Sequence, residues 1–343
     1  MTIVTLQRLW SVAVPLLGAA LAWRLLPEPV APWQVAAAAA LAPVLVVTSL
    51  LAVEFTVAAA VDPRAPRKPL RRVLRMWWQE ASVSLRLFLW RQPWRSTFPE
   101  PPLARDPQRP ALLLIAGFMC NRAAWKPLLD AGLLRGFNVA TVNLEPIFGD
   151  IDAYAEVVQR AVERLRQQTA AARVVLVGHS MGGLAARAYL RRYGDAQVAR
   201  VVTLASPHHG TIFGRLGHSR NARQMARGSR FVEHLNRDDH GRWRRFTTVA
   251  ALDDNLVVPR TSPLLPGARQ VELDGVGHLA LIEDPRAWQV IVEAAGAGAT
   301  TVYSYKLSAC NRLGCSPATS PAAVPLAAVG LGATAAAAGT SRI

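Results

Sequence analysis

The 343-residue sequence is poor in cysteine and in acidic side chains. Its three cysteines, Cys120, Cys310 and Cys315, fit neither a zinc site nor a disulfide framework for the main domain by number or spacing. Asp and Glu number 23 against 39 Lys and Arg, which gives a formal net charge of +16. Such an excess indicates an anionic partner, either a membrane surface or a nucleic acid.

Two stretches near the N-terminus lack charged residues altogether. Neither Leu9–Trp23 nor Val30–Val53 carries a charge. The run Val35–Val53 is long enough to cross a bilayer, which takes about 20 apolar residues, whereas the first stretch is marginal and contains Pro15. A secretory signal peptide fits poorly, because no small-residue cleavage site separates the two runs. We predict two membrane-spanning helices within residues 1–61; the alternative is a pair of buried globular helices.

The positive charge is concentrated directly after these stretches, in residues 62–110. The basic residues up to position 95 are Arg64, Arg67, Lys68, Arg71, Arg72, Arg75, Arg86, Arg91 and Arg95, and among them lie Trp77, Trp78, Trp90 and Trp94. This composition predicts an amphipathic juxtamembrane segment on an anionic membrane surface. We disfavour nucleic acid as the partner, because no recognition fold is visible and apolar stretches come immediately before. The positive-inside rule places the remaining chain in the cytoplasm.

From Ala111 to His278 short apolar runs alternate with helical segments, which is typical of a parallel sheet with helices on both faces. The predicted strands are Ala111–Ala116, Phe137–Val142, Val174–Val177, Val201–Ala205, Phe246–Ala250 and Gln270–Leu273. The predicted helices are Ala124–Leu134, Ala153–Gln168, Gly183–Arg192 and Trp288–Ala294. We therefore expect an α/β domain over residues 111–296, preceded by a proline-rich linker at 101–110.

Ser180 stands at the junction of a predicted strand and a predicted helix. The segment Gly178-His179-Ser180-Met181-Gly182 has the pattern G-x-S-x-G, which also arises by chance in many proteins. Here an apolar run enters it and a helix-forming run leaves it. Its glycines make room for a sharp turn that displays the serine in a strained conformation. The context therefore predicts a nucleophile elbow.

A serine hydroxyl needs a histidine base that is itself held by a carboxylate, and in this kind of fold the order is serine, acid, histidine. Asp253 and Asp254 follow one predicted strand and His278 follows the next. These residues thus lie at the same sheet edge as Ser180. We predict His278 as the base and favour Asp254 over Asp253 as the acid.

The oxyanion of an acyl-transfer reaction needs two backbone N–H donors. Met181, directly after the nucleophile, supplies the first, and Phe118 after the first strand is the candidate for the second. We expect His179 to pack within the elbow and to point away from the side on which the serine is displayed. His208 and His209 are adjacent, so their side chains are expected to point to different sides. The sequence has no third ligand at a suitable spacing, so a metal site is not expected there.

Residues Ala111 to about Pro285 resemble the serine lipases and esterases of the α/β-hydrolase superfamily, in its bacterial lipase branch. The resemblance rests on G-H-S-M-G-G at the elbow, on the segment Val202–Thr211 and on D-x-x-V-x-P beginning at Asp254. The family usually has His-Gly in the oxyanion loop, where this chain has Ala116. Since the donor there is a backbone group, this departure casts little doubt on catalysis.

The resemblance implies an α/β-hydrolase fold and a carboxylic ester hydrolase that acts on lipid or acyl esters through an acyl-serine intermediate, without a cofactor. The apolar and basic N-terminal segments lie outside the resemblance, and from them we expect the protein at a bacterial inner membrane. An acyltransferase or a thioesterase with the same site is one alternative. A catalytically idle membrane-bound interaction protein is another, although a complete triad in the correct order argues against it.

Two further segments lie around or after the triad. The arginine-rich insertion 211–243 is either a lid over the active site or a solvated pair of connecting helices. Residues 297–343 resemble the last hairpin of a fibronectin type III domain followed by a disordered tail, with a Cys310–Cys315 bond if the compartment is oxidising. All triad candidates follow Ala111, so we expect a fragment beginning near Pro102 to keep the site.

Overall fold

A computed structural model describes residues 2–62, 68–237 and 242–296. These residues belong to one unit, Met1–Val302. The expected hairpin and tail within 297–343, with Cys310 and Cys315, lie outside the described residues.

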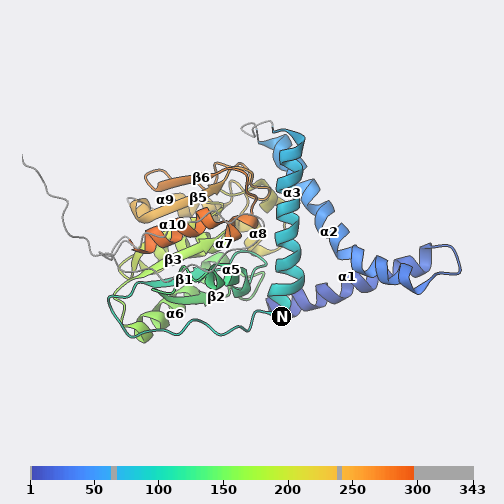
Figure 1. Ribbon diagram of the computed structural model, residues 1–343. Coiled ribbons are helices and arrows are strands. Elements are labelled where there is room, and N and C mark those ends of the chain that lie inside the picture. Colours follow the sequence, from blue (N-terminus) through green and yellow to red (C-terminus); the bar gives the residue numbers. More distant parts are fainter. Residues whose placement is uncertain (1, 63–67, 238–241, 297–343) are drawn as a thin grey trace, which may run out of the picture. The chain divides into compact units, whose positions relative to one another are not determined.

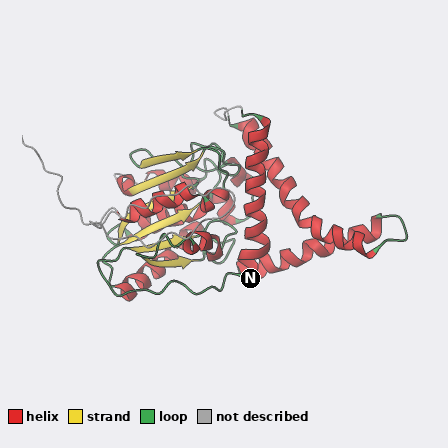
Figure 2. Cartoon of the chain, viewed as in Figure 1, coloured by secondary structure: helices red, strands yellow, loops and turns green. Residues whose placement is uncertain are grey.

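Six parallel strands form a single sheet in the order β2-β1-β3-β4-β5-β6 (Figures 1 and 2). The strands are β1 (Ala111–Ile115), β2 (Asn138–Val142), β3 (Val174–His179), β4 (Val198–Leu204), β5 (Phe246–Ala251) and β6 (Arg269–Leu273). β1, β3 and β5 are buried along their whole length, as expected for apolar strands covered on both faces. The six predicted strands are confirmed with small shifts at their ends, the largest being that β4 begins at Val198 instead of Val201.

Helices cover both faces of this sheet. On one face α6 (Ile151–Thr169) and α7 (Met181–Tyr193) pack their apolar stripes, and α10 (Pro285–Gly296) packs on the other. These three helices confirm the prediction. The predicted helix Ala124–Leu134 is wrong in extent: a 3-10 turn at Arg122–Trp125 leads into the short α5 (Lys126–Asp130). The chain turns away at Gly132, whose φ of +72° favours glycine and ends the helix.

The order of the strands creates a crevice at one edge of the sheet. β1 lies between β2 and β3, so the connections that leave β1 and β3 run in opposite directions. In open α/β sheets this switch point is where ligands bind, just past the carboxyl ends of the strands. The elbow at Ser180 follows β3 and the loop at Gly117 follows β1, so both lie at this crevice.

The N-terminal part is helical. It consists of α1 (Ile3–Leu25), α2 (Pro32–Val61), α3 (Leu70–Leu85), a π-helical turn η1 (Arg86–Arg91) and the short α4 (Gln92–Trp94). α1 and α2 are long and apolar enough to cross a membrane by length and composition, and only 17% and 22% of their apolar windows are buried. Exposed large side chains on them include Leu16, Leu17, Leu21, Trp33, Leu41 and Leu45.

The basic segment after α2 contacts the α/β part of the chain. Lys68 pairs with both Asp253 and Asp274, and Arg72 also pairs with Asp274. Arg86 and Arg91 both pair with Glu283. Val83 of α3 and Leu87 of η1 are buried in the same apolar cluster as the sheet. Part of the positive charge that the sequence assigned to a membrane surface is therefore neutralised by acids of the same chain.

Candidate active site

Ser180 occupies the turn between β3 and α7 with φ +53° and ψ −122°, a strained conformation for a residue with a side chain. The neighbouring glycines are required by close packing. A Cβ at Gly178 would lie 2.5 Å from the Gly183 nitrogen, and one at Gly182 would lie 2.4 Å from the Ile115 oxygen. The G-x-S-x-G pattern thus has the geometry of a nucleophile elbow.

Asp254 and His278 lie next to each other at the ends of β5 and β6. His278 Nδ1 is 3.0 Å from Asp254 Oδ2 and 3.1 Å from Oδ1. Asp254 is fully buried, and its Oδ1 also accepts hydrogen bonds from the backbone N–H groups of Leu256 and Val257, at 2.8 and 2.7 Å. These bonds fix the carboxylate, and the carboxylate in turn fixes the orientation of the imidazole.

Asp253, the second candidate acid, faces a different partner. Its carboxylate pairs with Lys68 and accepts a hydrogen bond of 2.8 Å from the Gly275 N–H. A shift of one residue at the end of a strand turns the side chain to the other side. Of the two neighbouring aspartates, the structure therefore brings Asp254 to His278 and Asp253 to the N-terminal segment.

The surroundings of His278 favour its charged form. Burial by itself would lower the pKa of this imidazole, but the charge and hydrogen bond of Asp254, together with the charges of Glu80 and Glu54, raise it above its usual value. An imidazolium formed when His278 accepts a proton is therefore stabilised.

His179 is a second buried imidazole beside the site. Its Nε2–H donates to the His278 carbonyl oxygen at 3.1 Å, and the two ring centroids are 4.8 Å apart. Burial and the neighbouring His278 hold the pKa of His179 well below its usual value. His179 packs within the elbow as predicted, but it lines the same cavity as Ser180 and does not point away from it. The reason is that the loop bearing His278 offers it a carbonyl acceptor.

One predicted oxyanion donor lies within the elbow and the other lies in the loop beside it. Met181 is the first residue of α7, and Phe118 is in the loop after β1. That loop contacts the elbow closely, because a Cβ at Gly117 would lie 3.0 Å from the His179 oxygen and 3.1 Å from Ser180 Cβ. The next residue, Met119, has φ +57°, so the backbone turns sharply beside the serine.

Glu80 of α3 holds the loop that carries His278. It is fully buried, and its two carboxylate oxygens accept hydrogen bonds from the backbone N–H groups of Leu279 and Ala280, at 2.6 and 2.9 Å. A Cβ at Gly277 would lie 2.5 Å from Glu80 Oε2, so the approach depends on glycine. Burial, opposed by these two hydrogen bonds, raises the pKa of Glu80 to about 7.

α1 and α2 also contact the site through polar side chains. Asn255 Nδ2 donates to Glu54 of α2 at 2.7 Å, while Asn255 Oδ1 accepts from the His278 N–H at 3.1 Å. Gln7 Nε2 of α1 donates to the Met119 carbonyl oxygen at 2.9 Å. The N-terminal helices thus hold both the histidine loop and the loop after β1.

Sequence reasoning missed Glu80, Glu54 and Gln7. A signal was present for the two glutamates, because Glu80 is the lone acid between Arg64 and Arg95 and Glu54 is the lone charged residue between Val30 and Val61. An isolated acid in such surroundings is costly to bury without a partner. From the sequence, each glutamate could therefore have been predicted to have a hydrogen-bonding partner elsewhere in the chain.

Ser180 and His278 line a common cavity of about 990 Å³. Its walls come from α1, α2, η1, the loop after β1 and the insertion 211–243. The insertion forms a 3-10 turn at Ile212–Arg215, α8 (Arg220–Gln224) and α9 (Arg230–Arg237). From it, Phe213, Gly214, Gly217, His218, Ser219, Ala222 and Met225 line the cavity.

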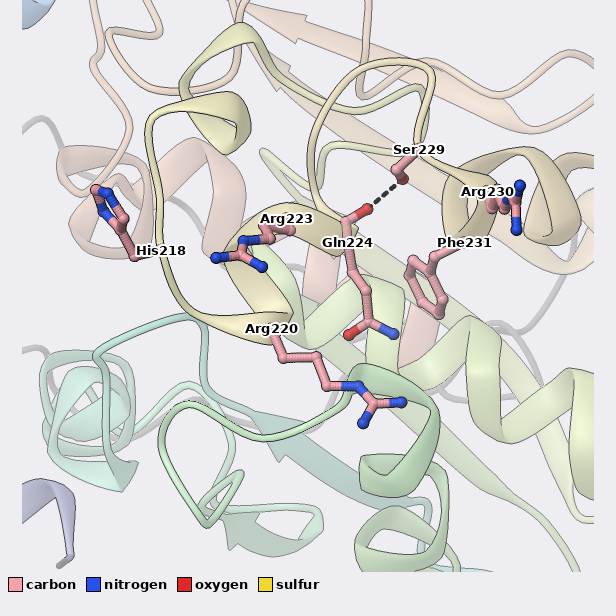
Figure 3. Close-up of a pocket in the computed structure, with 7 residues that line it drawn as sticks. All are labelled: His218, Arg220, Arg223, Gln224, Ser229, Arg230 and Phe231. Atoms are coloured by element: carbon pink, nitrogen blue, oxygen red, sulfur yellow. Dashed lines mark hydrogen bonds between the residues drawn. The ribbon is translucent and has the colours of Figure 1, made fainter.

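A second pocket, of about 480 Å³, is formed within the insertion itself (Figure 3). Arg220, Arg223 and Arg230 line it, and the Ser229 hydroxyl donates to the Gln224 carbonyl oxygen at 2.5 Å. His218 borders both pockets, but Ser180 and His278 line only the larger of these two. We therefore place the candidate active site in the 990 Å³ cavity.

His208 and His209 bond to protein groups. His208 Nε2 is 2.9 Å from Thr203 Oγ1, and His209 Nε2–H donates to the Leu264 carbonyl oxygen at 3.0 Å. Among the described residues no three His, Cys, Asp or Glu side chains are grouped as metal ligands.

Comparison with known proteins agrees with this architecture. Residues 149–227 match the model of the PGAP1-like alpha/beta domain family. The mature form of Bacillus licheniformis lipase BlEst2 matches with a TM-score of 0.50 and 18% identity over 56% of this chain and 94% of that one. Aspergillus fumigatus lipase B matches with a TM-score of 0.54 and 13% identity over 83% of this chain and 85% of that one. The chain thus contains a domain of the α/β-hydrolase fold that is similar to bacterial and fungal lipases, and two apolar helices precede this domain.

Proposed function

We propose that the protein is a serine hydrolase of carboxylic esters. The observation that carries this proposal is that His278, whose Nδ1 contacts Asp254, lines the same cavity as the strained Ser180. A buried carboxylate, an imidazole and a serine in an elbow are the groups that nucleophilic acyl transfer requires.

In this mechanism His278 Nε2 takes the proton of the Ser180 hydroxyl as Oγ attacks the ester carbonyl. The N–H groups of Phe118 and Met181 hold the resulting oxyanion. His278 then gives its proton to the leaving alcohol, which leaves an acyl-serine. A water molecule, deprotonated by His278 in the same way, releases the acid and restores the serine.

Covalent labelling tests the nucleophile. A fluorophosphonate probe should label the full-length protein at Ser180, and the protein should hydrolyse p-nitrophenyl acetate. Ser180→Ala should abolish both signals. Ser219→Ala is the matched control, because Ser219 lines the same cavity outside the elbow and should leave labelling intact. Labelling that persists in Ser180→Ala would contradict the proposal.

We further propose that α1 and α2 insert into a membrane, with the catalytic part on the cytoplasmic face of a bacterial inner membrane. Their long apolar, largely exposed windows support insertion, and the basic residues after α2 support the orientation. Reporter fusions at Pro29 and at Pro102 test this. Pro29, between the helices, should report the outside and Pro102 the cytoplasm; an external signal at Pro102 would overturn the orientation.

A further inference from the structure

The catalytic cavity extends from the triad candidates to the N-terminal helices. α1 contributes Leu6, Gln7 and Trp10 to its wall, and α2 contributes Val46, Val47, Leu50, Leu51 and Glu54. The helices that are long and apolar enough to cross a membrane are therefore the same helices that enclose one side of the site. Figure 1 shows α1, α2 and α3 beside the α/β part.

The wall on α2 contains two stripes with different exposure. Val47 and Leu51, one helical turn apart, line the cavity and are 8% and 5% exposed. Val46 and Leu50, also one turn apart, line the same cavity yet are 47% and 57% exposed. The cavity therefore reaches the molecular surface along the stripe Val46–Leu50.

The surface around this opening is itself apolar. Leu45 and Val53 on α2 and Leu9 on α1 are each more than half exposed. Ser180, Asn255 and His278 give the same cavity polar groups, and Glu54 of α2 bonds to Asn255 there. A ligand with an apolar chain and a polar reacting group matches this combination. The volume of about 990 Å³ is at the upper end of the range of small-molecule sites.

We propose that the substrate is a membrane lipid ester whose acyl chain enters sideways from the hydrocarbon layer, between α1 and α2, and lies along Val46 and Leu50. This inference rests on the proposed ester hydrolysis and adds the source and route of the substrate. An acyl chain that moves from the bilayer into this opening stays against apolar surface throughout, so it avoids the cost of exposing methylene groups to water. The ester carbonyl then reaches Ser180 while the chain remains between the helices.

The test compares two esters on the full-length protein in phosphatidylcholine vesicles. p-Nitrophenyl palmitate carries a long chain that dissolves in the bilayer, whereas p-nitrophenyl acetate reaches the site from water. Leu50→Trp should narrow the opening and lower the ratio of palmitate to acetate rates by about tenfold or more, because a misplaced chain displaces the reacting carbonyl. Leu45→Trp is the matched control: Leu45 lies on the same helix with 60% exposure but outside the cavity wall, so both rates should stay unchanged.

Labelling of Ser180 by a short-chain fluorophosphonate keeps the outcomes separate. If Leu50→Trp is labelled normally and its palmitate rate equals that of the unmodified protein, the route between α1 and α2 is wrong. Equal losses in Leu50→Trp and Leu45→Trp would overturn it as well. If the unmodified protein is neither labelled nor active on acetate, the proposed ester hydrolysis itself fails. If Leu50→Trp loses labelling, Leu50→Ala replaces it, and an unchanged ratio of palmitate to acetate rates in that variant would overturn the route.

Discussion

The six-stranded sheet and the N-terminal helices both form the candidate active-site cavity, but they contribute different groups to it. Loops at the ends of β3, β5 and β6 carry the groups proposed to react, namely Ser180, Asp254 and His278. The helices contribute Glu80, Glu54 and Gln7, which hold the loops, and an apolar wall. The comparison teaches that the groups proposed to react and the side chains that hold their loops in position come from parts of the chain that are far apart in sequence.

This difference bears on the fragment beginning near Pro102. Such a fragment keeps every proposed reacting group, as the sequence indicates. It lacks Glu80, however, so the N–H groups of Leu279 and Ala280 would lose their acceptor. It also lacks Val83 and Leu87, which are buried in the apolar cluster of the sheet. A fragment that keeps its stability and full activity would show that the helices matter only for substrate access.

The largest effect is expected from the reacting groups on the sheet. Ser180→Ala and His278→Ala should each lower ester hydrolysis on the order of 10⁴-fold or more, because each removes a group without which the covalent route is closed. Circular dichroism and thermal melting should show an unchanged fold. Substantial residual turnover in either variant would remove that residue from the proposed triad.

The two neighbouring aspartates differ in the same way, because Asp254 contacts His278 and Asp253 contacts Lys68 of the N-terminal segment. Asp254→Asn should lower activity on the order of a hundredfold or more, since the amide no longer stabilises the imidazolium of His278. Asp253→Asn should leave the chemistry largely intact but destabilise the protein by about 2 kcal/mol, less than a fully broken buried pair, because Asp274 still faces Lys68. Kinetics and urea unfolding of both variants provide the measurement. The reverse pattern would transfer the acid role to Asp253.

A smaller effect is expected from the N-terminal side. Glu80→Gln should lower kcat by roughly tenfold with little change in KM, because the amide NH₂ cannot accept the hydrogen bond that one carboxylate oxygen accepts now. Gln79→Ala, an exposed neighbour on the same helix, is the control. A normal kcat in Glu80→Gln would leave Glu80 with a structural role alone.

The pH profile gives Glu80 a second readout. His278 acts as a base only when neutral, and its pKa is raised, so kcat/KM should fall as the pH drops through a midpoint above 6.5. Removing the charge of Glu80 or Asp254 should move that midpoint to lower pH, because each charge favours the imidazolium. An unshifted midpoint in both variants would contradict the electrostatic account of the site.

The smallest effect is expected at the insertion 211–243, which contributes another part of the cavity wall. Phe213 of the insertion lines the cavity, so Phe213→Ala should change the ratio of long-chain to short-chain ester rates by only a few-fold, through lost apolar contact. A series of p-nitrophenyl esters of increasing length measures this ratio. An unchanged profile would argue against a substrate-contacting lid at 211–243.

Much of the fold followed from local patterns. Apolar runs of strand length alternating with helical segments predicted the parallel sheet, and parallel strands place their carboxyl ends at one edge. For that reason the order of Ser180, the two aspartates and His278 along the chain was enough to predict that they lie at one edge of the sheet. The shortened helix near Ala124 was missed, because the left-handed turn at Gly132 ends it where the composition still favours helix.

The sequence by itself determined the sheet, the elbow, and Ser180 and His278 as candidates, since these depend on neighbours within a few positions. Tertiary structure decided which aspartate meets His278. Asp253 and Asp254 are adjacent after β5, so their side chains point to different sides and only one of them can face His278. It also decided the role of Glu80, whose backbone partner Leu279 lies 199 positions along the chain. Periodicity carries no information about contacts of such separation, and only the packing of α3 against the histidine loop brings that carboxylate to the site.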